Sequence, residues 1–380
     1  FSFNLDSPKS NNDWTDIYYS KNNNLNNFKF NNQFDLIYKS KKISRYRISK
    51  NILFYKNSII TSDIKGNLII FSLNENEVVT KFNFYKKRYK KIDKILNLIL
   101  ENDILYVSDN IGYLYSFDLK KNQILWAKKY KIPFRSNLKL FNNSLITSNQ
   151  NNELLFLNKI NGNILKSIPT EETNIKNQFI NNLSINDKKL FFINTFGSLY
   201  SVDIKEKKLE WFINLNQTNN INPSNLFLGN EIIVENNKII STSNHFTYII
   251  NSNNGSIIHK KKISSIVKPL LHKNYLFVVN KNNFLIAMDT ISGKIIYSYD
   301  LNQKVSEFLK IKKDTLKINY VMMLNNEIFI FLKNSYVLNL GINGNLKEIR
   351  KFPSSISSLP IIIDDKILYL NNKGKVLFIN

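Results

Sequence analysis

Short apolar runs and polar clusters alternate along most of the chain. From about residue 33 onward, runs of four to seven residues rich in Ile, Leu, Phe, Tyr and Val are separated by clusters of Asn, Gly, Ser, Asp and Lys. This alternation predicts β-strands joined by turns, and helical spacing is nowhere sustained. The runs at residues 276–279, 328–332 and 361–363 are continuously apolar, which is typical of strands buried on both faces between stacked sheets.

A repeat is clearest in two windows of fifteen residues, from Gly112 to Trp126 and from Gly197 to Trp211. The windows share Gly, Leu, Tyr, Ser, Asp, Lys and Trp at equal offsets. We assign each glycine to a tight turn between two strands, and each Asp, at 118 and 203, to capping the following turn. The Trp falls in the outermost strand, where its ring can seal one blade against the next.

Weaker copies of the repeat keep the same offsets along the rest of the chain. Successive anchors lie 38 to 51 residues apart, which is the length of a four-stranded propeller blade. The eight anchors are Gly66, Gly112, Asn152, Gly197, His245, Asn283, Asn334 and Gly374. We therefore predict an all-β fold, an eight-bladed β-propeller of four-stranded antiparallel blades.

The two ends of the chain are predicted to complete one blade together. The last repeat copy reaches only the position equivalent to Asp118 at Asn380, so its outermost strand is missing. The apolar segment from Phe34 to Tyr38 is predicted to supply that strand, which closes the ring and removes an exposed sheet edge. We divide the chain into a flexible, Asn-rich polar leader or tether at residues 1–32 and a single propeller at residues 33–380.

The chain is strongly basic, with 53 Lys and Arg against 29 Asp and Glu and a formal net charge of +24. Such an excess suggests nucleic acid, anionic lipid or an acidic partner. The Lys residues are spread along the whole chain, so we interpret most of this surface as solvated and compositional and leave a basic-partner role open. The densest run, KKRYKK at residues 86–91, has an aromatic residue interleaved and could grip phosphates or lipid headgroups. Residues 39–47 and 259–262 are weaker runs.

Several classes of site find no support in the sequence. There is no Cys, which leaves no disulfide, thiolate metal site or cysteine nucleophile. No apolar run approaches the roughly 18 residues that span a bilayer as a helix. P-loop, dinucleotide-glycine and nucleophile-elbow motifs are also absent, so we expect neither phosphate chemistry nor serine hydrolysis.

The Gly-x-Leu-Tyr-Ser-x-Asp pattern ending in Trp, together with DTISGK at residues 289–294, resembles the PQQ-like, quinoprotein-type repeat of β-propellers. The resemblance covers about residues 34–380 and is strong in three blades. Within that superfamily, the repeat number and the polar leader look most like the BamB-type lipoproteins of outer-membrane β-barrel assembly. The resemblance implies a scaffold at the periplasmic face of the outer membrane that binds an outer-membrane β-barrel insertase complex.

The same resemblance implies two features that the sequence does not display. BamB-type proteins carry a lipidated Cys at the mature N-terminus, so membrane contact through a lipid anchor upstream of Phe1 is an expectation. Their partner-contacting loop corresponds here to the stretch from about Ile168 to Leu183. Its motif has no match, so we assign no partner-binding residue.

A quinoprotein dehydrogenase is the enzymatic alternative, because those enzymes share the repeat. It would need acidic and amide ligands for Ca²⁺, a catalytic carboxylate and groups that stack on the quinone. Turn positions already explain Asp118, Asp203 and Asp289, while Asp364 and Asp365 read as a surface-turn pair.

The three histidines, His245, His259 and His272, are scattered without metal-ligand spacing. His259 occupies the place of Trp126 in its repeat, which favours packing. We therefore predict a non-enzymatic protein-binding scaffold with no catalytic, cofactor-binding or metal-binding residues, no cofactor and no small-molecule substrate. The alternatives are a PQQ- and Ca-dependent dehydrogenase and, less favoured, a propeller that binds nucleic acid or another anionic ligand.

Overall fold

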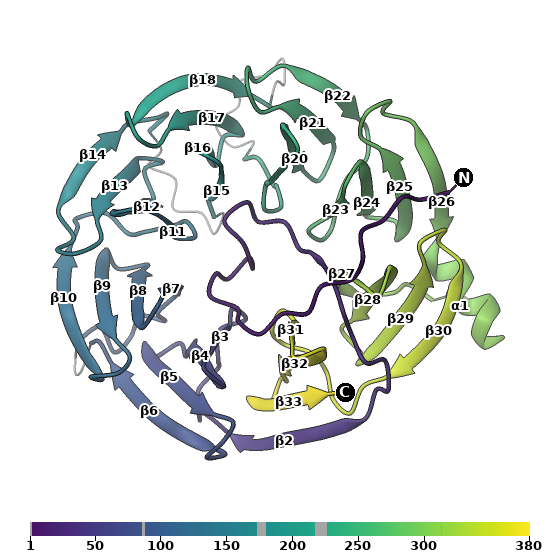
Figure 1. The fold of residues 1–380 in the computed structure, drawn as a ribbon, viewed down its shortest axis with the longest axis horizontal. Helices are drawn as coiled ribbons and strands as arrows, with labels where there is room; N and C mark the ends of the chain where they lie inside the picture. Colours follow the sequence, from purple (N-terminus) through teal and green to yellow (C-terminus); the bar gives the residue numbers. More distant parts are fainter. Residues whose placement is uncertain (1, 86–87, 173–179, 217–225, 313) are drawn as a thin grey trace.

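Eight β-sheets surround a central axis in the computed structural model, which describes every residue except 1, 86–87, 173–179, 217–225 and 313 (Figure 1). In each sheet four antiparallel strands run outward from the axis to the rim, and the sheets follow one another around the ring in chain order. The predicted eight-bladed propeller of four-stranded blades is confirmed.

The first four blades follow the chain without interruption. Their strands are β3 (Leu53–Tyr55), β4 (Ser58–Ser62), β5 (Asn67–Ser72) and β6 (Glu77–Asn83) in blade 1; β7 (Leu96–Glu101), β8 (Ile104–Asp109), β9 (Tyr113–Asp118) and β10 (Gln123–Lys129) in blade 2; β11 (Lys139–Phe141), β12 (Ser144–Ser148), β13 (Leu154–Asn158) and β14 (Ile164–Ile168) in blade 3; and β15 (Asn182–Asn186), β16 (Lys189–Ile193), β17 (Ser198–Asp203) and β18 (Lys208–Asn214) in blade 4.

The last four blades include two additions from the N-terminal part of the chain and one helix. Their elements are β19 (Ile233–Glu235), β20 (Lys238–Thr242), β21 (Thr247–Asn251) and β22 (Ile257–Lys261) in blade 5; β23 (Leu270–His272), β24 (Tyr275–Val279), β25 (Phe284–Asp289) and β26 (Ile295–Asp300) in blade 6, followed by helix α1 (Leu301–Leu309); β1 (Asn27–Phe28), β27 (Ile318–Leu324), β28 (Glu327–Leu332), β29 (Tyr336–Gly341) and β30 (Leu346–Lys351) in blade 7; and β31 (Ile361–Ile363), β32 (Lys366–Leu370), β33 (Lys375–Ile379) and β2 (Leu36–Lys42) in blade 8.

Burial along each blade explains the two kinds of apolar pattern. Middle strands are covered by the neighbouring blades on both faces, so β5 is buried throughout and reads as a continuous apolar run. The outermost strands alternate instead: in β10 every second side chain is exposed. Every sequence anchor lies at the same place, in or beside the turn that joins the second and third strands of its blade.

The two tryptophans of the repeat seal blade 2 against blade 3 and blade 4 against blade 5, as predicted. The indole nitrogen of Trp126 donates to the Lys159 carbonyl at 3.1 Å, across the boundary between blades 2 and 3. Gly162 lies under this ring with a φ of +72°, and a Cβ there would come within 2.8 Å of the indole. Only glycine combines that backbone conformation with such a close approach. Trp211 repeats the arrangement over Gly255 in the next-but-one boundary.

The ring closes where the two ends of the chain pair. Strand β2 is the outermost strand of blade 8 and runs antiparallel to β33, with Leu36 opposite Ile379 and Tyr38 opposite Phe378. The prediction that the N-terminal segment supplies the missing strand is therefore confirmed, and the pairing leaves the last blade no shorter than the others.

Residues 2–32 correct one prediction. The sequence predicts a flexible leader or tether, whereas the structure places this segment across the centre of the ring (Figure 1). Trp14, Ile17, Leu25, Phe28 and Phe30 are all buried, with at most 6 % of each side chain exposed. The physical reason is that these five residues, although widely spaced among Asn and Ser, fit the apolar inner edges of the blades.

Candidate functional site

The segment at residues 9–32, here called the channel segment, contacts the innermost strand of every blade or the turn that follows it. The backbone of Trp14 exchanges two hydrogen bonds with Phe54 of β3, at 2.7 and 2.8 Å. Further along, the Thr15 carbonyl accepts from Leu100 of β7, and the Lys21 carbonyl accepts from Ile185 of β15.

The other blades are held in the same way. The Asn22 carbonyl accepts from Val234 of β19, and the Asn24 amide donates to the Leu271 carbonyl of β23. Residues Asn27 and Phe28 form β1, which pairs in parallel with β27 of blade 7. The Asn11 amide donates to the Ile362 carbonyl of β31. The channel segment therefore occupies the axis as a built part of the protein.

A buried ion pair connects the channel segment to blade 3, the remaining blade. Lys139 Nζ lies 2.6 Å from the Asp16 carboxylate, and both side chains are almost fully enclosed. Burial lowers the pKa of Lys139, and the Asp16 charge opposes that shift. Lys139 also donates to the Ser20 carbonyl at 2.9 Å, and Asp16 accepts from the Tyr18 backbone N–H. The pair is thus supported by additional hydrogen bonds, as a buried pair requires.

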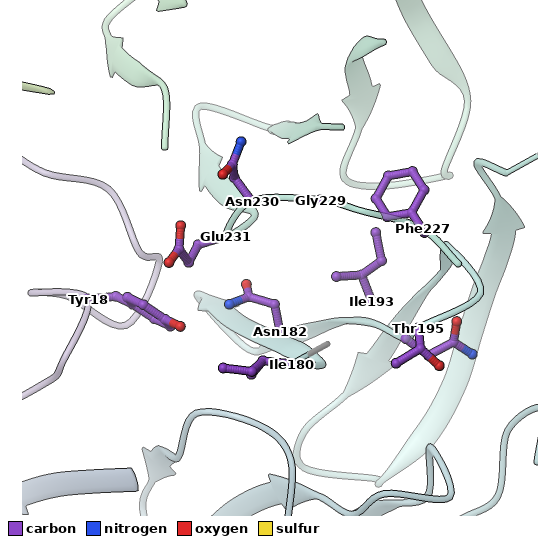
Figure 2. Close-up of a pocket in the computed structure, with 10 residues that line it drawn as sticks. Tyr18, Ile180, Asn182, Ile193, Thr195, Phe227, Gly229, Asn230 and Glu231 are labelled. Atoms are coloured by element: carbon purple, nitrogen blue, oxygen red, sulfur yellow. The ribbon is translucent and has the colours of Figure 1, made fainter. Parts of the chain in front are cut away.

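Two adjoining pockets lie beside the channel segment, and both are lined by Tyr18 of that segment. The first has a volume of about 230 Å³ and lies between Tyr18 and the loops at Asn182 and Glu231 (Figure 2). The second, of about 320 Å³, shares Tyr18 and Glu231 and adds Lys268. Figure 2 shows the Tyr18 ring and the Glu231 carboxylate on the same side of the first pocket, across from Phe227.

Electrostatics in the second pocket are dominated by burial. Burial lowers the pKa of Lys268 to about 8, with the Glu231 charge acting in the opposite direction. Burial together with Glu231 and Asp16 raises the pKa of Tyr18 well above its usual range, and burial raises that of Tyr320 to about 12. The Lys268 ammonium lies 5.4 Å from the centre of the Tyr18 ring, a cation–π distance.

The carboxylates named from the sequence lie at turns, as expected. Asp118 accepts from the backbone N–H groups of Lys120 and Lys121, and Asp203 and Asp289 cap their own turns in the same way. Asp364 and Asp365 form a turn with positive φ at both residues, but Asp365 also pairs with Lys29 of the channel segment at 3.0 Å.

The histidines do not converge. His259 takes the Trp place, packs over Gly293 and contacts the Ile291 carbonyl at 2.8 Å, so the packing prediction is confirmed. His272 accepts from the Asp6 backbone N–H, and His245 lies beside Phe246. Across the described part of the chain, no three His, Cys, Asp or Glu residues are placed to hold a metal ion.

The predicted partner loop and the densest basic run are described only in part. Residues 173–179 of the stretch from Ile168 to Leu183 lie outside the described residues, as do Lys86 and Lys87 of the basic run. At the edge of the partner loop, Glu171 accepts from Ser198 and Tyr200 of blade 4.

The connections between blades lie on one side of the ring, here called the interblade face. They share it with the second turn of each blade, as shown by hydrogen bonds from Gln150 to the Pro133 carbonyl and from Asn244 to the Leu228 carbonyl. Among the described residues, five large apolar side chains on these connections are exposed: Ile92, Ile95, Ile180, Leu228 and Ile266. Phe308, Leu309 and Ile311 are also exposed, but they lie on or beside α1, which packs against β26 and β30 at the rim. The turns of the opposite face expose two, Ile160 and Ile291, within the described residues.

The fold has close counterparts among solved structures. BamB from Moraxella catarrhalis superposes with a TM-score of 0.69 over 90 % of this chain and 99 % of its own, at 10 % identity. Quinohemoprotein alcohol dehydrogenase from Comamonas testosteroni gives 0.68 over 97 % of this chain and 80 % of its own, also at 10 % identity. At this identity the similarity shows the fold alone. No helix within the described ranges is long and apolar enough to cross a membrane.

Two proteins and one family model are similar to this chain in sequence. An uncharacterized protein of Rickettsia conorii is 24 % identical over 95 % of this chain and 89 % of its own length. A second, from Rickettsia prowazekii, is 23 % identical over 77 % of this chain and 72 % of its own. The family model described as outer membrane protein assembly factor BamB matches residues 98–299, which is more than half of the chain. The chain therefore belongs to the BamB family of PQQ-like repeat β-propellers.

Proposed function

We propose that this propeller is a non-enzymatic scaffold in outer-membrane β-barrel assembly, held at the periplasmic face of the outer membrane, where it binds the barrel insertase. Membership of the BamB family supports this role. The observation that carries it is that, among the described residues, the connections of the interblade face expose five large apolar side chains against two on the turns of the opposite face, and a partner can cover such side chains. Eleven others lie on the outermost strands at the rim.

The rigidity of the ring supports a docking role. A scaffold positions its loops only if the blades cannot shift, and the channel segment bonds to all eight blades. The outer seals add a second set of contacts between neighbouring blades at the rim. Loops on the interblade face are therefore presented at fixed separations, which reduces the ordering cost of binding.

The residues do not fit the quinone and calcium site of the dehydrogenase alternative. Such a site needs several carboxylate and amide oxygens around one cation, whereas the described residues contain no cluster of three potential acidic or histidine ligands. The axis is also occupied by the channel segment. We propose no reaction for this chain. A titration with PQQ and Ca²⁺ that gave tight, stoichiometric binding would overturn this part of the proposal.

Site-specific photo-crosslinking tests the docking face. A photoreactive residue replaces Leu228 or Ile266 on the interblade face, and Ile160 or Ile291 on the opposite face as matched controls. All four side chains are exposed, at 38, 41, 69 and 62 % respectively. In gently solubilised envelopes, we expect the first two to crosslink to an outer-membrane barrel insertase and the controls not to do so.

Substitutions give a second measurement. Leu228→Asp with Ile266→Asp is expected to reduce recovery of the insertase in a pull-down by about tenfold, because each change places a charge in a desolvated contact. The pair Ile160→Asp and Ile291→Asp should leave recovery unchanged. Equal crosslinking from both faces, or recovery of soluble proteins alone, would contradict the proposal.

A further inference from the structure

A second, strongly basic cavity lies at the interblade face, on the outer part of blade 1. Its volume is about 490 Å³, within the usual range for small-ligand pockets. Three chain segments form it: the β2–β3 connection, the end of β6 with the neighbouring β4–β5 turn, and the β6–β7 connection. Six of the lining residues are cationic: Arg45, Lys65, Lys81, Arg88, Lys90 and Lys94.

Within the described part of the chain, no acidic side chain lines this cavity. Ion pairs with Asp or Glu are also absent for these six cations among the described residues, although elsewhere Lys56 and Lys120 share Asp103, and Lys189 pairs with Glu210. Within the described ranges, the six cations therefore have neither a carboxylate in the cavity lining nor an ion pair of their own.

Three carboxylates near the cavity, those of Asp63, Asp93 and Asp109, form hydrogen bonds or an ion pair with other groups. Asp63 accepts from the Ser44 hydroxyl, from the Asn67 side chain and from the Lys65 backbone N–H. Asp109 accepts from the Tyr85 hydroxyl and from three backbone N–H groups of its turn. Asp93 pairs with Arg47, which is not among the residues that line the cavity. The charges of Asp93 and Asp109 reach Lys94, but neither carboxylate lines the cavity.

Lys94 shows that the cations are held together and not merely adjacent in a solvated loop. Its side chain is 5 % exposed, its ammonium lies 5.3 Å from the centre of the Tyr85 ring, and it donates to the Tyr89 carbonyl. Burial and the Lys65 charge lower its pKa, while the Asp93 and Asp109 charges act in the opposite direction. Lys65 in turn contacts the Lys90 carbonyl. These contacts fix two ammonium groups in a shared concave site.

The cation types indicate the ligand. Two guanidinium groups, from Arg45 and Arg88, offer planar pairs of donors that match phosphate oxygens, and the lysines add point charges. Arg45 is positioned over the Tyr46 ring at 4.8 Å, which restrains it at the rim. A single small cavity does not supply the extended track that a nucleic-acid strand requires.

We propose that this cavity binds a compact anion with two or more phosphate groups, either as the headgroup of an anionic lipid or as a soluble pyrophosphate-like molecule. This site lies on the same interblade face as the proposed docking surface, on the connection that also exposes Ile92 and Ile95, but it does not depend on the proposed scaffold role. Arg45, from the basic run at residues 39–47, and Arg88 and Lys90, from the described part of the run at residues 86–91, line this cavity together.

The test uses pyrophosphate as probe and the full chain by isothermal titration at low ionic strength. The variant Arg45→Gln with Arg88→Gln removes two exposed cations from the cavity. The control, Lys166→Gln with Lys208→Gln, removes the same charge from exposed positions on β14 and β18. We expect the first variant to bind pyrophosphate about tenfold more weakly or worse, and the control to bind within twofold of the unmodified chain.

Flotation with vesicles separates the two sources of phosphate. Retention on vesicles that contain cardiolipin, whose headgroup has two phosphates, but not on phosphatidylcholine vesicles, lost in the Arg45→Gln and Arg88→Gln variant, identifies a lipid headgroup. Pyrophosphate binding without retention identifies a soluble anion. The proposal is overturned if pyrophosphate does not bind, if both variants bind equally, or if affinity for a single-stranded oligonucleotide rises with its length while pyrophosphate fails to compete.

Discussion

The channel segment and the basic cavity differ in whether a buried cation has an ion-pair partner. In the channel, Lys139 is fully enclosed but has the Asp16 carboxylate at 2.6 Å and the Ser20 carbonyl as a second partner. In the cavity, Lys94 is nearly as buried, yet it forms no ion pair among the described residues, and the Lys65 charge adds to the effect of burial while Asp93 and Asp109 oppose it. The first pair is complete within the chain, whereas we propose that a bound anion completes the second group.

In a chain with a net charge of +24, the presence or absence of a carboxylate partner separates structural from functional cations. Charge count alone does not distinguish the two regions. A buried cation with its own carboxylate is part of the fold. Removing one partner lowers stability strongly, because the other charge is left buried and unpaired. Cations grouped in a concave site without carboxylates repel one another and lower the stability of the fold. Such locally unfavourable arrangements are typical of binding sites.

Trp14→Ala should cause the largest loss of stability in the channel. The side chain is fully buried and packs on Tyr19 and Phe28, with ring centroids 4.7 and 5.8 Å away. The free energy of unfolding should fall by about 3–5 kcal/mol, the usual cost of such a cavity, measured by urea denaturation. Trp14→Phe is the control and should cost much less, because it keeps most of the packing. A flexible leader would show no loss in either variant.

Lys139→Ala tests the paired charge and should cost about 3 kcal/mol, since it leaves the Asp16 carboxylate buried without its partner. Lys159→Ala is the matched control. Its partner, Glu101, is 37 % exposed, so this loss should stay below about 1 kcal/mol. Urea denaturation of both variants measures the difference, and equal losses would show that the channel pair is not enclosed.

Most of the propeller could be predicted from the sequence, and the channel segment could not. Repeats such as Gly112 to Trp126 recur because each blade meets the same geometric demands, so the Trp seal and the Asp cap appear at fixed offsets. The channel segment meets eight different strand edges in turn. Its buried residues therefore have no period, and its many Asn side chains, such as Asn23 bonding to Leu183 and Ile232, read as disorder.

The signal that could have found this segment is its aromatic content. Trp14, Phe28 and Phe30 are costly to leave in water, and a true tether is usually poor in large apolar residues. The basic cavity was predictable in part: the two basic runs were visible, but their meeting depends on the order of blades around the ring. Lys65, Lys81 and Lys94 carry no sequence signal, because isolated lysines are common throughout this chain.

The pH dependence of stability distinguishes a third cation, Lys268, from both regions. Its pKa is about 8 in the folded chain and 10.5 in its usual state. Between these values the unfolded chain holds a proton that the folded chain has lost, so unfolding takes up a proton and stability rises with pH. We expect a gain of about 1–2 kcal/mol from pH 8 to 10.

Lys268→Met supplies the control for that titration. The variant should lack this component of the rise, because the side chain no longer titrates. The difference between the two unfolding curves, measured at each pH, isolates Lys268 from other lysines and tyrosines. If the curves stay parallel across the range, Lys268 is solvated as an ordinary lysine.

Removing a cation from the basic cavity should have the smallest effect and the opposite sign. Lys65→Gln relieves the repulsion on Lys94, so the free energy of unfolding should rise by about 0.5 kcal/mol at low salt. Added salt screens the same repulsion, so the gain should disappear near 1 M sodium chloride, where the Debye length is about 3 Å. Lys139→Ala should remain destabilising there, because its pair is enclosed. A loss of stability in Lys65→Gln would mean that this lysine supports the fold, and the two regions would then no longer differ in kind.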